Sequence, residues 1–233
     1  MLCLPQDLSG FQTEMFDSIV RQSPPMKGKR SLYHQGNRFA NLYVVRSGCV
    51  KKIHYTQDGT EQIIGFSLPG ELLGLNAIAT DQYNETAMTL NTTSVCKLDY
   101  ARFEELCEKI PGLAKQVLKM AGQELIEEQN LRLTISAKNA EERLAMFYSS
   151  LSTRFQLLGY SPYEFILSMN RLDIGNYLGM TYETVSRTTM KLVKQGLIEI
   201  DRKHVKIKDP EGLKVLAGHC DVCPSLNISN SGY

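Results

Sequence analysis

The chain has 233 residues, a formal net charge of +1 and 42% hydrophobic residues. That length allows one large domain or two small ones with a proper core, and the composition is that of a soluble globular protein. The near-zero charge argues against a globally basic protein that binds polyanions. No apolar run approaches the roughly 20 residues of a membrane span, and residues 1–7 do not form a secretory signal. We therefore expect a cytoplasmic protein with no membrane partner.

Residues 1 to about 27 are predicted to form a helical lead-in, because Leu8, Phe11, Met15 and Ile19 recur at helical spacing. From residue 30 to residue 98 the hydrophobic period changes to two, and short strands are expected at 31–36, 42–46, 50–55, 62–66 and 94–98. The dipeptide Asp58-Gly59 between two of these runs is a strong hairpin signal. Glycine-punctuated short strands at regular spacing predict a small β-sandwich or barrel.

From residue 100 the helical period returns. A short helix over 101–108 is followed by a long one over 113–135. Positions spaced three and four apart on the long helix form a coiled-coil seam: Leu118, Ala121, Leu125, Glu128 and Arg132. Such a helix predicts a homodimer in which two copies pair along the seam. The alternative is a single helix buried against its own β-domain.

A third region begins at Asn139, which forms a capping-box pattern with Glu142. Within it, residues 170–197 are predicted to form two short helices joined by a tight turn. Asn170 is a suitable N-cap for the first helix, Gly179 ends that helix, and Thr181 caps the second. This pattern is typical of a helix-turn-helix, whose second helix enters the DNA major groove by its N-terminal end. The alternative is an ordinary pair of surface helices.

The polar face of the second helix carries groups that can read base edges. Arg187 can donate two hydrogen bonds to a guanine, Glu183 can accept from an exocyclic amine, and Ser186 can donate or accept. Glu183 and Arg187 lie one turn apart and can pair when DNA is absent. The predicted DNA-binding residues are Thr181, Tyr182, Glu183, Ser186, Arg187, Lys191 and Lys203.

The charge around this region is uneven. Residues 169–208 contain eight Lys or Arg and four Asp or Glu, a local surplus of basic groups where DNA would bind. Residues 197–200 and 204–207 alternate around Asp201-Arg202-Lys203, which predicts a β-hairpin wing. Lys203 there would contact phosphate rather than bases.

Enzyme activity is not expected. The four histidines are scattered, and the sequence contains no Gly-rich phosphate loop, nucleophile elbow or paired-carboxylate motif. Residues 220–233 are rich in Ser, Asn and Gly, and we expect them to form a tail.

A glycine-punctuated β-roll, a long helix and a winged helix-turn-helix in this order resemble the CRP/FNR superfamily of bacterial transcription regulators. Four motifs look like its FNR (fumarate and nitrate reduction regulator) branch: Gln62-Ile-Ile-Gly-Phe, Lys138-Asn-Ala-Glu-Glu-Arg-Leu-Ala, Asp173-Ile-Gly-Asn-Tyr-Leu-Gly and Glu183-Thr-Val-Ser-Arg. The resemblance covers residues 2–219. It implies an α+β fold with a cyclic-nucleotide-binding-like β-roll over 1–109, a dimerisation helix over 110–137, a winged helix-turn-helix over 138–219 and a tail over 220–233.

The resemblance also implies a function. The Glu, Ser and Arg that match Glu183, Ser186 and Arg187 read a TTGAT half-site, paired as an inverted repeat of double-stranded DNA. The homodimer is expected to contact RNA polymerase and to act in oxygen- or redox-linked control. In the family a loop matching Asp58-Gly59-Thr60 touches the polymerase, but Thr60 stands where the family has an acidic residue. The alternative is a β-roll sensor of a ligand or of redox state that acts through protein partners without specific DNA binding.

Cyclic AMP is not expected as a ligand. The family holds the ribose with the Glu of a Gly-Glu-Leu motif, which matches Gly70-Glu71-Leu72, and holds the phosphate with an Arg a dozen or so residues later. Between Leu72 and Thr93 the chain has no Arg or Lys. A buried phosphate without a neutralising cation is expensive.

An iron–sulfur cluster is the open question. Cys3 and Cys96 look like two of the four cysteines that hold a [4Fe–4S] cluster in FNR-branch sensors. Because such a cluster takes four thiolates, it is expected here only if further ligands exist. Three explanations stay open: a start upstream of Met1, loss of the cluster, or a contribution from Cys220 and Cys223.

Overall fold

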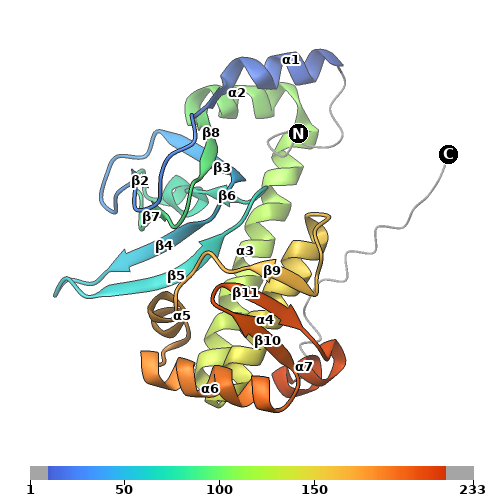
Figure 1. Ribbon diagram of the computed structural model, residues 1–233. Helices are drawn as coiled ribbons and strands as arrows, with labels where there is room; N and C mark the ends of the chain where they lie inside the picture. The colour runs from blue at the N-terminus through green and yellow to red at the C-terminus, as the bar shows by residue number, and fades with distance from the viewer. Residues whose placement is uncertain (1–9, 219–233) are drawn as a thin grey trace.

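The computed structural model describes residues 10–218. They form a β-roll and a smaller mixed domain, both packed against one long helix, α3 (Pro111–Ala137) (Figure 1).

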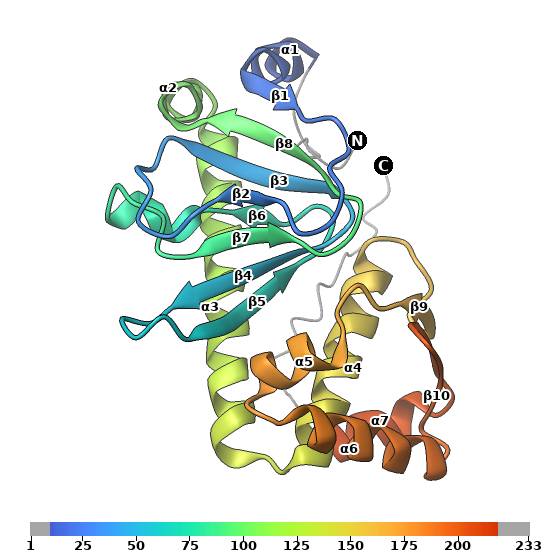
Figure 2. The ribbon, with the colours of Figure 1, turned by 60° about the vertical axis from the view of Figure 1, so that its left-hand side comes forward.

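The β-roll consists of two four-stranded antiparallel sheets. One sheet has the order β1-β8-β3-β6 and the other β2-β7-β4-β5, and in Figure 2 both lie above helices α5 and α6. The strands are β1 (Val20–Gln22), β2 (Ser31–Tyr33), β3 (Asn41–Ser47), β4 (Val50–Tyr55), β5 (Glu61–Ser67), β6 (Leu72–Leu73), β7 (Thr86–Thr89) and β8 (Ser94–Asp99). A short 3-10 helix, η1 (Leu75–Ala79), follows β6. The expected small β-structure of short strands is therefore present, with β1, β6 and β7 beyond those the sequence indicated.

The predicted helical lead-in is wrong beyond residue 19. Helix α1 (Gly10–Ile19) ends there, and Val20 to Gln22 pair with Leu98 to Cys96 of β8 instead. The apolar spacing of Met15 and Ile19 does not reveal this, because a distant strand supplies the hydrogen-bond partners. Leu8, the first residue of the predicted pattern, lies outside the described residues.

The β4–β5 hairpin forms at the predicted dipeptide. Gly59 has a φ of 82°, which glycine adopts without strain, and its amide donates to the carbonyl of Thr56. Strand β5 is at the edge of its sheet, so its outer backbone groups pair with no other strand of residues 10–218.

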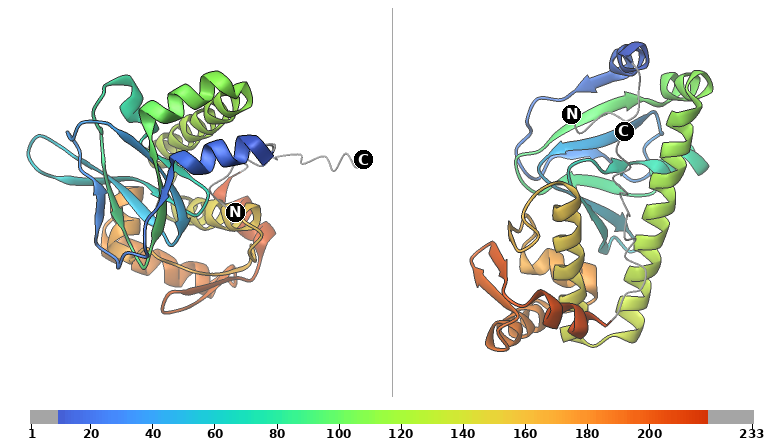
Figure 3. Two further views of the ribbon diagram at one scale, coloured as in Figure 1. Left: turned by 90° about the horizontal axis from the view of Figure 1, so that it is seen from above. Right: turned by 90° about the vertical axis from the view of Figure 1, so that its right-hand side faces the viewer.

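Two helices follow the β-roll. Helix α2 (Tyr100–Lys109) is capped by the side chain of Asp99, and α3 begins with Pro111 in its first turn, where the missing N–H costs nothing. With 27 residues α3 is about 40 Å long and runs past both domains (Figure 3). Its outer face carries apolar side chains, since Leu118 is 74% exposed and Leu125 is 58% exposed.

The C-terminal domain has the predicted caps. The helices are α4 (Ala140–Leu157), α5 (Arg171–Leu178), α6 (Tyr182–Lys194) and α7 (Pro210–Ala217). Asn139 and Glu142 form a capping box at α4, Asn170 and Asp173 form one at α5, and Thr181 caps α6. The wing strands β10 (Ile198–Asp201) and β11 (His204–Ile207) pair as expected, and β9 (Glu164–Ile166) adds a third strand that the sequence did not indicate.

The hydrophobic core has two parts. One lies inside the β-roll, around Leu42, Val45 and Leu98. The other is built mainly from the C-terminal domain but also contains Phe66 and Leu68 of the β-roll. The two domains therefore share a core. No helix within residues 10–218 is long and apolar enough to cross a membrane.

Candidate nucleic-acid interface

Helix α6 has one buried face and one open face. Val185, Thr188, Thr189 and Leu192 are buried against the domain. On the opposite side Tyr182, Glu183, Arg187 and Met190 are exposed, and Ser186 is half-buried. Because side chains four apart share a helix face, Glu183 and Arg187 project together from the N-terminal half of the helix. In Figure 1 this helix lies at the end of the molecule farthest from α1.

The tight packing of α5 against α6 fixes the position of the open face of α6. This face, formed by Tyr182, Glu183, Ser186, Arg187 and Met190, is called the reading face below. A Cβ on Gly175 would stand 2.6 Å from the carbonyl oxygen of Met180, so only glycine allows this approach. Arg171 of α5 donates from Nη1 to Ser186 Oγ at 3.0 Å. Arg143 of α4 donates to the carbonyl oxygen of Leu178. The two helices therefore behave as one unit.

The carboxylate of Glu183 is kept ionised. Its own backbone N–H and the hydroxyl of Thr181 hold its pKa below the usual range, and the nearby charge of Arg187 adds to this. An ionised carboxylate only accepts hydrogen bonds, which suits an exocyclic amine of a base. Among the described residues Glu183 and Arg187 form no ion pair, so the pairing expected in the absence of DNA is not seen.

The other predicted DNA-binding residues differ in whether their polar groups are already engaged within the protein. Thr181 is exposed, but its hydroxyl is used as the N-cap, accepting from the amide of Thr184 at 3.2 Å. Lys191 is also exposed, yet its ammonium forms an ion pair with Glu141 of α4. Lys203 is exposed at the turn of the wing. Sequence reasoning identified Lys191 as a DNA contact but could not show its pairing with Glu141, which lies 50 positions away.

Comparisons with known proteins agree with this geometry. Residues 26–110 match the model of the cyclic nucleotide-binding domain, and residues 142–216 match the Crp-like helix-turn-helix domain. The chain is 42% identical to the transcriptional activator protein FnrA of Stutzerimonas stutzeri over 93% of its length and 89% of that protein. It is 38% identical to the fumarate and nitrate reduction regulatory protein of Escherichia coli over 94% of its length and 87% of that protein.

The chain belongs to the FNR branch of the CRP/FNR superfamily. It is therefore a DNA-binding transcription regulator, and the relatives are regulators rather than enzymes. The α+β fold is confirmed by FixK2 of Bradyrhizobium japonicum, with a TM-score of 0.79, 26% identity and coverage of 86% of this chain and 98% of that one.

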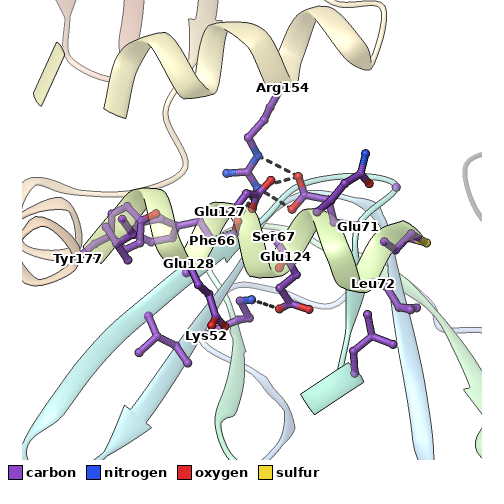
Figure 4. A pocket seen from close by; sticks show the side chains of 17 residues that line it. Lys52, Phe66, Ser67, Glu71, Leu72, Glu124, Glu127, Glu128, Arg154 and Tyr177 are labelled. Carbon is purple, nitrogen blue, oxygen red and sulfur yellow. Dashed lines mark hydrogen bonds and ion pairs between the residues drawn. The ribbon is translucent and has the colours of Figure 1, made fainter. Parts of the chain in front are cut away.

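In this FNR-branch regulator, the β-roll, α3, α4 and Tyr177 of α5 line an open pocket of about 150 Å³ (Figure 4). Lys52 of β4 points into it and forms an ion pair with Glu124 of α3. A Cβ on Gly65, the residue opposite on β5, would stand 2.6 Å from Lys52 Cε. Glycine at this position lets the lysine side chain lie across the strand and reach the helix.

The charge of Lys52 is stabilised by its neighbours. Burial favours the neutral amine, but the carboxylates of Glu124 and Glu85 outweigh it and raise the pKa of Lys52. Glu85 is 1% exposed and accepts hydrogen bonds from Tyr33 Oη and Asn76 Nδ2. Burial raises the pKa of Glu85, and the charge of Lys52 opposes that rise.

The Gly70-Glu71-Leu72 motif is engaged within the protein. Arg154 of α4 donates to both carboxylate oxygens of Glu71, at 2.6 and 2.7 Å from Nη2, and also to the carbonyl oxygen of Phe66 (Figure 4). The glutamate that would bind a ribose in the resemblance instead holds the DNA-binding domain. Because this ion pair uses both oxygens of the carboxylate, it is consistent with the prediction that cyclic AMP is not a ligand.

The cysteines within residues 10–218 do not assemble a cluster site. Cys96 is fully buried in β8, between β1 and β3, and Cys3 lies outside the described residues. Cys49 is buried in the shared core, where burial raises its pKa to about 12, and Cys107 is on α2. No three His, Cys, Asp or Glu side chains of the described chain are placed to hold a metal ion. The described part of the chain therefore does not supply the four thiolates of a [4Fe–4S] cluster.

Proposed function

We propose that this regulator binds, as a homodimer, an inverted repeat of TTGAT-like half-sites and controls transcription in response to oxygen or redox state. The observation that carries the proposal is the open face of α6. Glu183 and Arg187 are exposed there, and Ser186 is held by Arg171 between them. These residue types match the amine acceptor, guanine donor and adaptable hydroxyl that such a half-site requires.

The surroundings of α6 support DNA binding. Five cationic side chains around the reading face and the wing are exposed and outside any ion pair of the described residues: Arg187, Lys194, Arg202, Lys203 and Lys206. They can contact phosphates on either side of the groove that α6 enters.

The test is a competition assay with the full-length protein. Fluorescence anisotropy is measured on a labelled duplex with two inverted TTGAT half-sites, against an unlabelled duplex of the same composition with scrambled half-sites. We expect the specific duplex to bind at least 1,000-fold more tightly, the lower end for specific DNA-binding proteins. Equal competition by both duplexes would reject the proposal.

A homodimer is supported by the outer face of α3. Leu118 and Leu125 are seven positions apart and exposed, Ala121 between them is half-buried, and Glu128 and Arg132 continue the line as exposed residues. An apolar stripe that is exposed in the single chain is typical of a helix that a partner covers in the assembled protein.

Substitution of this stripe tests the dimer. In Leu125→Glu two carboxylates would meet across the seam, so we expect a monomer at micromolar concentration by sedimentation velocity. The matched control is Lys119→Glu on an exposed position of α3 outside the predicted seam, which should leave a dimer. A dimeric Leu125→Glu protein would show that α3 does not pair in this way.

Contact with RNA polymerase is proposed for the tip of the β4–β5 hairpin. Thr60 there is not acidic, but it donates from Oγ1 to Asp58 Oδ2 at 3.0 Å. The hydroxyl of Thr56, together with the amide and hydroxyl of Thr60, lowers the pKa of Asp58. Asp58 is exposed, so the tip still presents a negative charge. The relatives' names, which call FnrA and anr transcriptional activators, support activation as the outcome.

A further inference from the structure

The first helix of the DNA-binding unit is attached directly to an exposed strand edge. Asn176 of α5 faces β5, the edge strand of its sheet. Its Oδ1 accepts from the amide of Ile63 at 2.5 Å, and its Nδ2 donates to the carbonyl oxygen of Glu61 at 2.8 Å. These are the two bonds that one residue of an added parallel strand would make to positions on either side of Gln62. The side chain of Asn176 thus takes the place of a missing strand.

Neighbouring polar contacts strengthen this attachment. Gln62 Nε2 donates to the backbone carbonyl of Asn176 at 2.9 Å. Lys51 of β4 contacts both Glu61, at 2.9 Å, and Asp173, at 3.1 Å. Asp173 is also the capping-box residue of α5, so the same carboxylate holds both the helix start and the β-roll. Both Figures 1 and 2 show α5 next to the β4–β5 hairpin.

The attachment leaves the reading face free. Tyr182 is 46% exposed, and Glu183 and Arg187 are exposed, while α5 is docked on β5. Because α5 and α6 form one unit through Gly175 and the bond from Arg171 to Ser186, fixing α5 also fixes the orientation of α6 relative to α3. The contact therefore orients α6 without covering it.

In a homodimer joined along α3, the orientation of α6 relative to α3 determines the distance and angle between the two copies of α6. We propose that Asn176 is a positioning residue that sets the spacing between the two half-sites which the dimer accepts. This rests on the proposed function. Changing the spacer by one base pair moves one half-site by about 3.4 Å and rotates it by roughly a tenth of a turn. A rigidly held pair of helices cannot follow that change.

The experiment uses full-length Asn176→Ala and a series of duplexes whose two TTGAT half-sites are separated by spacers that differ by single base pairs. Alanine favours the helix, so α5 itself should form. We expect wild type to prefer one spacer and to lose at least 10-fold in affinity one base pair away. In the variant, affinity at the preferred spacer should fall about 10-fold, and the penalty one base pair away should shrink to about 3-fold or less. Affinity for a duplex with a single half-site should not change.

Two further variants separate positioning from damage to the fold. Gln62→Ala leaves the sequence of the DNA-binding domain intact and should give the same relaxation of spacing to a smaller extent. The matched control is Asn84→Ala, because among the described residues the Asn84 side chain donates only to Asn76 and Thr80 of the β-roll. This variant should keep the wild-type spacing penalty.

Three results would overturn the inference. They are an unchanged spacing penalty in Asn176→Ala, a loss on the single half-site as large as on the repeat, and tighter binding at every spacer, which would make the contact inhibitory. Failure of the proposed function looks different, since wild type itself would then show no preference for any inverted repeat.

Discussion

Replacing Arg187 by alanine is expected to weaken binding to the inverted repeat and to remove the preference for guanine in each half-site. A bidentate arginine–guanine contact contributes about 1–3 kcal/mol of discrimination, so two half-sites lose roughly 2–6 kcal/mol if their contributions add. The measurement is anisotropy on the TTGAT repeat and on a repeat in which each guanine is replaced by adenine. Wild type should discriminate strongly between the two duplexes, and the variant should bind both equally.

The matched control is Lys203→Ala, a change of a cation in the wing. Because a phosphate contact carries no base information, this variant should weaken binding to both duplexes by the same factor and make the dependence on salt less steep. If Arg187→Ala behaves in the same way as Lys203→Ala, then Arg187 contacts the DNA backbone and does not read the guanine.

Replacing Lys52 by methionine is expected to cost the largest amount of folding free energy. Methionine keeps most of the side-chain volume but removes the charge that faces Glu124 and the buried Glu85. Breaking a buried ion pair by removing one partner costs about 3–5 kcal/mol. We expect about 3 kcal/mol, because the side chain of Glu124 is 24% exposed and can turn to solvent. Urea unfolding at pH 7.5 measures the loss.

The loss in Lys52→Met should depend on pH in a defined direction. Without the lysine, the pKa of folded Glu85 rises further, so the folded state binds more protons than the unfolded state above the ordinary carboxylate pKa of about 4.3. Stability then falls as pH rises from that value, and the variant should lose less at pH 5 than at pH 7.5. Lys52→Met combined with Glu85→Gln should remove most of this pH dependence. A loss independent of pH would show that Glu85 does not depend on Lys52.

Local signals in the sequence were sufficient for the starts of three helices in the C-terminal domain. Asn139, Asn170 and Thr181 were predicted as caps, and their side chains accept from backbone amides in the first turns they precede. A cap depends on residues within three or four positions, so the information is contiguous in the chain. The same holds for the hairpin at Asp58-Gly59 and for the wing around Asp201 to Lys203.

Several features were outside the reach of local signals. Strands β1 and β9 are three residues long and depend on distant partners, and Lys191 is paired with a residue of another helix. The ion pair between Arg154 and Glu71 joins two residues that are 83 positions apart in the chain. The Gly70-Glu71-Leu72 motif indicated that the carboxylate of Glu71 binds a polar group. It could not show that this group is a side chain of the same protein.

The sequence by itself determined the two helices of the DNA-reading unit, the residues on their open face and the order of the domains, because these follow from spacing and capping along the chain. Only the tertiary structure decided where that unit sits. Asn176 meets the free edge of β5, and Arg154 meets Glu71, through contacts between segments that no local pattern relates. Those contacts act between separate domains, so their geometry exists only after the chain has folded.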